Sequence, residues 1–263
     1  MNNDSYSGLI AKAVKYLWHQ VNHRNEKYFL KVSYIEIYNE QINDLLNIKG
    51  TNLQMRGTQN NNFFVEGATV IECKHPNEVV EILLEGNKNR KVGSHELNKD
   101  SSRSHSIFIV YVISESFSEE GQVIKKYGKI SLVDLAGSER LKESKSQGDM
   151  IKETGNINKS LFVLGKVISV LTEKREVNSA ANKKIHIPYR DSKLTMLLSD
   201  SLGGKAKTIL FACISPSSTY ADESLSTINY ATRAMNIQNK PIIQVTFFWR
   251  YFLMRYLINL MLL

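Results

Sequence analysis

Residues 133–140, with the sequence VDLAGSER, end an apolar stretch and place two acidic residues around a glycine. Asp134 and Gly137 form a D-x-x-G pattern, which is one way to sense a phosphate at the end of a strand. The carboxylate can approach a bound Mg²⁺ ion, commonly through water, and the glycine lets its backbone N–H come close to a terminal phosphate because it has no Cβ. Taken alone the pattern is weak, since an exposed loop containing Asp and Gly is a commoner explanation.

A second polar segment, NKDSSRSHSIF, begins at Asn98 and runs directly into another apolar strand. Ser101 and Ser102 carry hydroxyl groups suited to Mg²⁺ and to phosphate oxygens. The guanidinium of Arg103 can form a two-pronged pair with the carboxylate of Glu139. The two segments together indicate a phosphate-binding site more strongly than either does alone.

The serines of this segment also suit a polar turn or a phosphorylation site. A Ser-His hydrolase pair is not expected here. Ser104 and His105 point to opposite faces if the chain is extended, and the sequence has no nucleophile elbow around them.

Apolar periodicity predicts alternating helices and strands along the chain. Helices are predicted at residues 8–21, 41–47, 77–90, 148–173, 189–201 and 222–239, with Asn77 as a cap. Strands are predicted at 28–40, in short pieces within 52–72, and at 106–114, 128–136 and 207–215, with a hairpin turn around 119–121. This alternation is typical of an α/β layered domain, and no internal repeat interrupts it.

The composition bounds the class of protein. The 263 residues suffice for one large domain or two small ones, and 42% hydrophobic with 23% charged residues is ordinary for a folded soluble protein. The net charge of +8 favours an acidic partner, which could be nucleic acid, an anionic membrane or an acidic protein surface. A basic surface without a partner explains the charge equally well.

Two cysteines, Cys73 and Cys213, cannot build a disulfide framework, so a reducing compartment is expected. Cys73 and His75 stand one residue apart, but no second Cys/His pair completes a tetrahedral metal site. The polar N-terminus, MNNDSYSG, carries no signal peptide.

Five segments occur in the order and spacing of kinesin motor domains: NKDSSRSH, VDLAGSER, NINKSL, HIPYRDSKLT and DSLGG. The closing ESLSTINYATRA, followed by NKP, resembles the last helix of that family and the start of its neck linker. The resemblance covers about residues 8–241. It implies an α/β, three-layer P-loop-NTPase-like kinesin motor fold with a mixed central sheet and helices on both faces, and a domain over residues 1–241 followed by a divergent hydrophobic tail over 242–263.

The resemblance also implies a function: ATP hydrolysis, with Mg²⁺, coupled to movement along microtubules. Switch I would comprise Asn98, Ser101, Ser102 and Arg103, and switch II residues 134–139. In such a site Ser102 and Asp134 would help to hold Mg²⁺, partly through water, and Asn98 and Ser101 would contact phosphate or the attacking water. The Gly137 N–H would sense the γ-phosphate, and Arg103 and Glu139 would close a salt bridge over the nucleotide while Glu139 relays a proton from water.

The expected partner is tubulin, and the expected location is the microtubule cytoskeleton of the cytoplasm. Asn158 and Lys159 match track-facing positions of the family's relay helix, and Arg190 and Lys193 match the adjacent loop and helix. Cations facing an acidic lattice raise the encounter rate and make binding sensitive to salt. We expect neither a nucleic-acid partner nor a membrane partner, and the absence of heptads leaves the oligomeric state undefined.

One family element is missing from the sequence. No G-x-x-x-x-G-K-[ST] loop is present, and the resemblance begins just after the position where that loop would end. Such a loop supplies much of the phosphate affinity, and its strand lies inside the family's sheet. We therefore expect a motor domain truncated at its N-terminus, a fragment or a truncated gene product, which neither hydrolyses ATP nor folds well alone.

The C-terminal residues 245–263 are long enough to span a bilayer if helical, at about 20 residues per span. Arg250 and Arg255 would then lie in hydrocarbon at about 2.5–3.5 kcal/mol each, so a membrane anchor is not the favoured interpretation. Two alternatives to the motor remain: a microtubule-binding protein that needs no nucleotide, or another P-loop NTPase such as a GTPase, to which the tubulin-facing segments are not suited.

Overall fold

The computed structural model describes residues 8–24, 26–57, 63–93, 103–137, 149–176 and 186–249, of which 91–93, 149–158, 174–176, 244 and 247–249 are described by their backbone alone. The expected residues Asn98, Ser101, Ser102 and Glu139 lie outside this part of the chain, and only the backbone of Asn158 lies within it.

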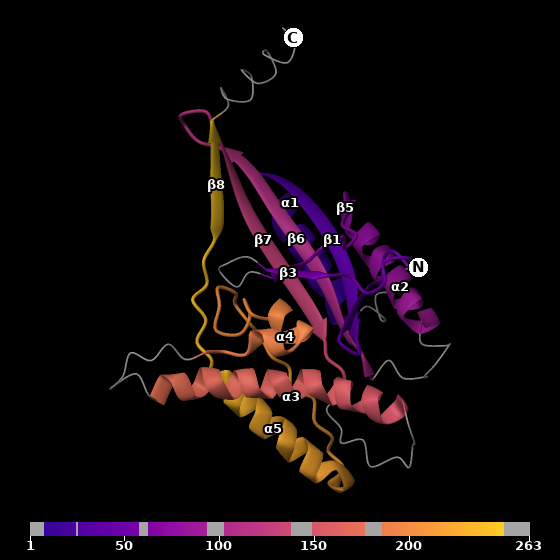
Figure 1. Cartoon of the computed structure of the whole chain (residues 1–263). Helices are drawn as coiled ribbons and strands as arrows, with labels where there is room; N and C mark the ends of the chain where they lie inside the picture. The colour runs from indigo at the N-terminus through magenta and orange to yellow at the C-terminus, as the bar shows by residue number, and fades with distance from the viewer. Residues whose placement is uncertain are drawn as a thin grey trace.

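The elements follow the predicted alternation, and Figure 1 shows their arrangement. The helices are α1 (Leu9–Asn22), α2 (Pro76–Gly93), α3 (Asp149–Glu176), α4 (Lys193–Leu197) and α5 (Ala221–Met235), with 3₁₀ turns η3 (Tyr189–Asp191) and η4 (Ser218–Tyr220). The strands are β1 (Lys27–Tyr38), β2 (Gln41–Asp44), β3 (Met55–Gly57), β4 (Phe63–Val65), β5 (Ile71–Cys73), β6 (His105–Phe117), β7 (Gln122–Asp134) and β8 (Gln244–Trp249).

The main sheet has the strand order β2-β1-β6-β7-β8, with β5 also paired to β1. All the pairings between described strands are antiparallel. The β6–β7 hairpin turns at Gly121, whose φ of 78° is readily adopted only by glycine, as the turn predicted around 119–121 requires. The hairpin places Asp134, the last residue of β7, opposite Ser106 near the start of β6.

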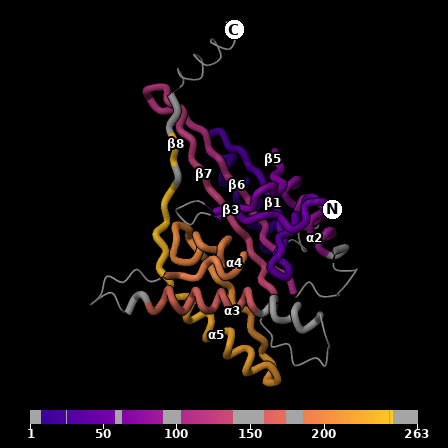
Figure 2. Tube along the Cα trace, in the orientation of Figure 1, coloured from indigo at the N-terminus to yellow at the C-terminus, as the bar shows by residue number. Residues whose placement is uncertain are grey.

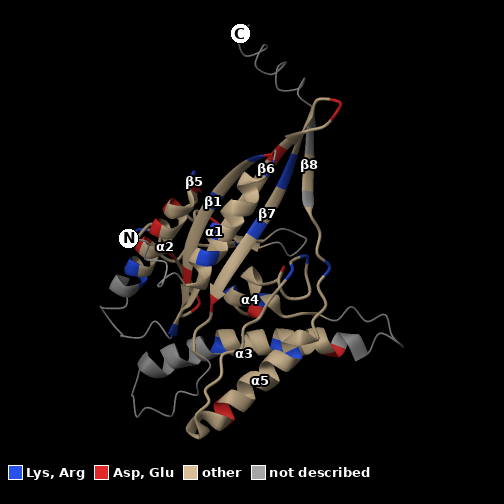
Figure 3. Ribbon diagram, turned by 180° about the vertical axis from the view of Figure 1, so that it is seen from behind, with Lys and Arg blue, Asp and Glu red and all other residues tan. Residues whose placement is uncertain are grey.

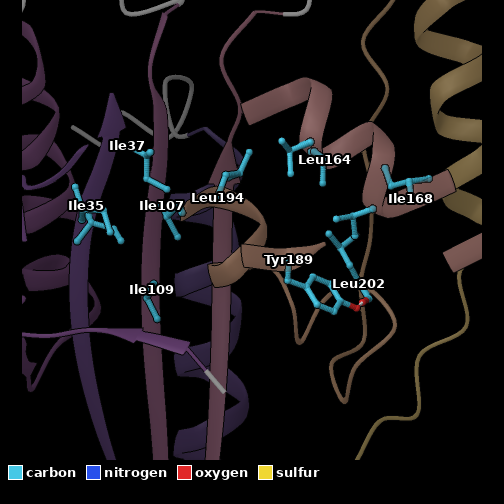
Figure 4. Packing of buried hydrophobic residues seen from close by; sticks show 12 residues of the cluster. Ile35, Ile37, Ile107, Ile109, Leu164, Ile168, Tyr189, Leu194 and Leu202 are labelled. Carbon is cyan, nitrogen blue, oxygen red and sulfur yellow. Dashed lines mark hydrogen bonds between the residues drawn. The ribbon is translucent and has the colours of Figure 1, made fainter. Parts of the chain in front are cut away.

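Both faces of β1 and β6 are buried, which makes the domain three-layered. In β6, Ile107 and Ile109 join a core cluster with α3, η3 and α4, whereas Phe108 and Val110 join a second cluster with α1 and α2. Because successive side chains of a strand point to opposite faces, an uninterrupted apolar run can fill two cores. Figure 4 shows the first cluster, with the strand isoleucines facing Leu164, Ile168, Tyr189, Leu194 and Leu202. The α/β class with helices on both faces is as predicted.

The helix predicted at 41–47 is wrong. Asn39 and Glu40 have φ values of 51° and 58°, and this left-handed pair forms a two-residue turn that folds β2 back on β1. Asp44 then fixes the following loop by accepting hydrogen bonds from the backbone N–H groups of Thr69 (2.7 Å) and Leu46 (2.9 Å). The left-handed turn at Asn39 and Glu40, and not apolar periodicity, decides the structure of this segment.

The helix predicted at 189–201 is broken into two short pieces. Ser192 is extended (φ −146°, ψ 145°), so η3 ends there and α4 begins with Ser192 as its N-cap. The Ser192 Oγ accepts from the Leu194 N–H at 3.2 Å. The predicted helix start at Asn77 is also shifted, because α2 begins at Pro76, a residue favoured in the first helical turn.

The prediction of a buried strand at 207–215 is also wrong. Residues 207–215 belong to no strand, and Ile209, Leu210 and Phe211 are 73%, 47% and 70% exposed. The part of the chain that the structure describes offers this segment no pairing partner. Within the same part, residues 128–134 of β7 pair with β6 on one edge and with no strand on the other, because β8 pairs only with residues 122–127.

The C-terminal region adds a strand to the sheet. β8 runs antiparallel to the first half of β7, from Gln244↔Tyr127 to Trp249↔Gln122. Figure 2 shows β8 beside β7. Residues 245–249 are therefore extended and do not start the helix considered for 245–263, whose remainder lies outside the described residues. No helix among the described residues is long and apolar enough to cross a bilayer. The boundary after residue 241 stays a prediction.

Candidate functional site

The candidate site lies where β7 ends and β6 begins. Asp134 closes β7 with its side chain 70% exposed, and Gly137 follows three residues later. Arg103 precedes β6 and is partly buried. The structure therefore brings the two sequence segments together at the same end of the sheet, where β7 ends and β6 begins, as the hairpin register requires. The predicted Arg103–Glu139 pair stays untested, because Glu139 is not among the described residues.

A residue that the sequence analysis missed, Arg90 of α2, organises this edge. Its guanidinium donates to Asp134 Oδ2 from Nη1 at 3.1 Å and to the Ser104 carbonyl from Nη2 at 3.0 Å. Hydroxyl groups of Ser104 and Ser106 accept from it at 3.2–3.3 Å, and Glu36 Oε1 lies 3.6 Å from Nε. The Arg90 side chain is only 11% exposed, so these partners compensate a cation largely removed from water.

Helical spacing could have revealed Arg90. Ile82, Gly86 and Arg90 follow one another at intervals of four, so they share one face of α2. Gly86 marks that face as the one against the sheet, because a Cβ there would come within 2.2 Å of the Tyr34 ring. An arginine one turn beyond such a glycine faces inward and needs an acidic partner.

His105, the first residue of β6, joins three elements. It is 2% exposed. Its Nδ1 accepts the backbone N–H of Ala136 at 2.9 Å, and its Nε2 lies 2.7 Å from the Ser160 Oγ of α3. Burial, with the positive charge of Arg90 as a second cause and partly offset by Asp134, lowers the pKa of His105 from 6.5 to about 4. The imidazole is therefore neutral at pH 7.

The predicted basic residues lie on and beside α3. Lys159 is exposed on α3, Arg190 is exposed in η3, and Lys193 is partly buried at the start of α4. Figure 3 shows basic positions along α3, and the acidic first turn of α5 at the far end of that helix. The Arg190 guanidinium lies 5.3 Å from the centroid of the Phe63 ring, a cation–π contact that links η3 to β4.

Glu40, another residue that the sequence analysis missed, positions this basic segment from the β1–β2 turn. Its carboxylate accepts from the Ser192 hydroxyl at 2.6 Å and from the Lys193 N–H at 2.8 Å. It thereby satisfies a backbone donor that the first turn of a helix leaves unpaired. No local sequence signal reveals a cap that comes from 153 residues away.

The donor groups at the sheet edge fit the metal end of a nucleotide site. An exposed carboxylate is a suitable hard oxygen ligand for Mg²⁺, directly or through water. Arg90 holds one oxygen of Asp134, which fixes the orientation of that carboxylate. The phosphate end fits less completely, since Gly137 is described but the sequence contains no G-x-x-x-x-G-K-[ST] loop.

Comparison with known proteins gives the family. The kinesin motor domain model matches residues 1–237. The chain is 42% identical to the kinesin-like protein KIN-12D of Arabidopsis thaliana over 243 residues, covering 90% of this chain and 9% of that protein. It is 42% identical to the kinesin heavy chain of Strongylocentrotus purpuratus over 241 residues, covering 91% of this chain and 22% of that protein.

A solved structure shows the same fold. It is that of a fast kinesin, studied for its ATPase mechanism and its interactions with microtubules, and it is 37% identical with a TM-score of 0.81. The match covers 94% of this chain and 67% of the other. The chain thus spans about a tenth to a fifth of the length of these curated relatives. Family model, relatives and fold agree, and the chain belongs to the kinesin motor domain family.

Proposed function

We propose that this chain is the switch and track-binding part of an ATP-driven, microtubule-based motor. The observation that carries the proposal is the edge of the sheet at which Asp134 and Gly137 leave β7, beside the buried Arg90 and with His105 connecting the same turn to α3. That arrangement joins a phosphate-facing turn to a helix with an exposed basic residue. A microtubule motor requires such a connection.

The residues divide the work at the nucleotide. Bound ATP with Mg²⁺ supplies the phosphoryl group that is transferred to water. Asp134 and Ser102 hold the metal side of the site, and the Gly137 N–H donates toward the terminal phosphate. Asn98 and Ser101 orient phosphate oxygens or the attacking water. Arg103 and Glu139 close over the site, and Glu139 accepts a proton from the water chain.

We also propose that the strand and loop that cradle the phosphates come from polypeptide outside these 263 residues. Two open features support this. The edge of β7 at 128–134 has no described partner away from β6, and residues 207–214 belong to no strand and carry exposed apolar side chains. A strand inserted between them would pair with the first and cover the second. A microtubule-stimulated ATPase assay tests this proposal. A chain extended upstream in frame should hydrolyse ATP, whereas the 263-residue chain should not.

The 263-residue chain itself should therefore show no microtubule-stimulated ATP hydrolysis, because backbone donors of a phosphate loop supply much of the affinity. Turnover by the purified chain above that of a Gly137→Ala variant would contradict this. The alternative, a microtubule-binding protein that needs no nucleotide, is favoured only by the missing loop. It predicts that the upstream-extended protein also binds microtubules equally well with and without ATP.

Lys159, Arg190 and Lys193, together with Asn158, form the proposed tubulin-facing surface. Replacing Arg190 and Lys193 together by glutamate should weaken microtubule co-sedimentation at least about tenfold at low salt, because two attractive charges become repulsive. A matched control is the pair Lys12→Glu and Lys74→Glu, which changes the net charge equally on the α1 side of the sheet. Equal binding by the two double variants would reject the assigned surface.

A further inference from the structure

His105 is the point at which three separate segments meet. It belongs to β6, its Nδ1 reaches the turn after β7, and its Nε2 reaches α3. The ring is 2% exposed, and Ser160 is 3% exposed, so solvent does not compete for either hydrogen bond. Each bond lost without a replacement would leave a buried polar atom unsatisfied, which costs more than the bond contributes when formed.

The two hydrogen bonds assign the protons of the ring. Because Nδ1 accepts from the Ala136 N–H, the ring proton lies on Nε2 and is donated to the Ser160 Oγ. The lowered pKa of His105, at about 4, keeps the ring neutral at pH 7, and the hydrogen bond from the Ala136 N–H selects this tautomer. A displacement of Ser160 therefore changes the position of the imidazole, and through it the direction of the Ala136 N–H.

The residues next to Ala136 and Ser160 indicate what this connection does. Ala136 directly precedes Gly137, whose N–H is proposed to face the terminal phosphate. Ser160 directly follows Lys159, and the two point to different sides of α3, since Lys159 is exposed and Ser160 is buried. The His105 imidazole is thus the link between the proposed phosphate-sensing turn and α3, whose other side is proposed to face the track.

We infer that His105 is a positioning residue that couples occupation of the outer face of α3 to the backbone of Ala136 and Gly137. The inference rests on the proposed function, because it requires α3 to meet the microtubule. It goes further by assigning the coupling to one side chain and to one hydroxyl acceptor. The proposed coupling predicts that microtubule binding changes the environment of the Ala136 amide even when no nucleotide is present.

Hydrogen exchange of the Ala136 amide tests this in the full 263-residue chain. Exchange is measured with and without saturating microtubules, saturation being established by co-sedimentation of each variant. In the native sequence, binding should change the exchange rate of this amide about fivefold or more, the lower range of known couplings. In Ser160→Ala, which removes the acceptor of the Nε2 proton, that change should fall below about twofold, whereas Ser160→Thr, which keeps a hydroxyl, should restore it.

Two further variants separate coupling from simple destabilisation. Ser169→Ala removes a hydroxyl from the same helix two turns further on and should leave the fivefold change intact. His105→Asn retains an acceptor near the Ala136 N–H but cannot reach Ser160, so it should behave as Ser160→Ala does. A full fivefold change in Ser160→Ala would overturn the coupling role of His105 but leave the proposed tubulin surface standing. Failure of the native chain to co-sediment would overturn both the role and the proposed tubulin surface.

Discussion

Two apolar segments of similar character have opposite fates in this molecule. Residues 105–110 of β6 are all at most 9% exposed, with β1 on one edge and β7 on the other. Residues 209–211 are 47–73% exposed and lie in no strand. Both segments are predicted as strands from the sequence. The difference teaches that apolar composition gives a segment the capacity to be buried, whereas neighbouring strands on both edges decide whether it is.

The largest effect on stability is expected when two phenylalanines, one from each segment, are compared. Phe108 is 1% exposed and packs edge-on against the Tyr34 ring at 5.3 Å between centroids, whereas Phe211 is 70% exposed. Phe108→Ala should lower the free energy of unfolding by about 3–5 kcal/mol through lost burial and a cavity. Phe211→Ala should change it by less than about 0.5 kcal/mol. Urea denaturation of both variants gives the two values, and similar losses would mean that 207–214 is packed in solution.

A second test uses acid, because His105 stands at the start of the well-covered strand. Its folded-state pKa of about 4 lies below the 6.5 of an unperturbed histidine, so the unfolded state binds the proton more readily. Stability should therefore fall as pH decreases from about 6.5 to about 4, by as much as roughly 3 kcal/mol for this group. Burial opposes protonation of the ring most strongly, Arg90 adds to that effect and Asp134 partly offsets it, so the net effect is a loss of stability in acid.

The measurement is the urea midpoint at pH 7 and at pH 4.5, for the native sequence and for His105→Asn. The variant cannot take up this proton, so its stability should decline less over the interval. The difference between the two declines isolates the histidine from other titrating groups. Parallel declines would show that the ring is solvated.

The smallest effect on stability is expected at the open edge. Ile130 of β7 and Ile209 are 40% and 73% exposed, and lysine at such an edge discourages pairing with another chain. Ile130→Lys combined with Ile209→Lys should change the free energy of unfolding by less than about 0.5 kcal/mol per site while reducing light scattering at high protein concentration. Phe162→Lys, at a 74% exposed position on a helix without unpaired strand groups, serves as the control. Scattering reduced equally by the control would point to general hydrophobic contact.

Local patterns predicted most of the elements, and their failures have definite causes. The helices α1 and α3 and the strands β1 and β6 follow from apolar spacing, because each buries apolar side chains. The spacing also predicts α5 and β7, although neither has a buried residue. The strand at 41–44 was mistaken for a helix because a two-residue turn of Asn39 and Glu40 outweighs periodicity. The strand prediction for residues 207–215 is wrong for a different reason: whether this segment pairs depends on strands distant in the chain, which its local sequence does not reveal.

The candidate site was predictable only where it is written in contiguous motifs. Asp134, Gly137 and Arg103 were singled out by such motifs, and the structure places Asp134 and Gly137 at one edge of the sheet with Arg103 near the start of the adjoining strand. Arg90 and Glu40 act across 44 and 152 positions of sequence, so their partners cannot be deduced from local pattern alone. The switch residues outside the described part of the chain stay predictions.

The cap that Glu40 provides to α4 has a consequence for the order of folding. Its two-residue turn can close within about 1–10 μs, as hairpins do, whereas the contact to Ser192 closes a loop across 152 positions and must wait for most of the chain. The basic segment at 190–193 should thus be among the last parts to acquire native structure. Pulse-labelling during refolding would show the Lys193 amide becoming protected after the amides of residues 41–44.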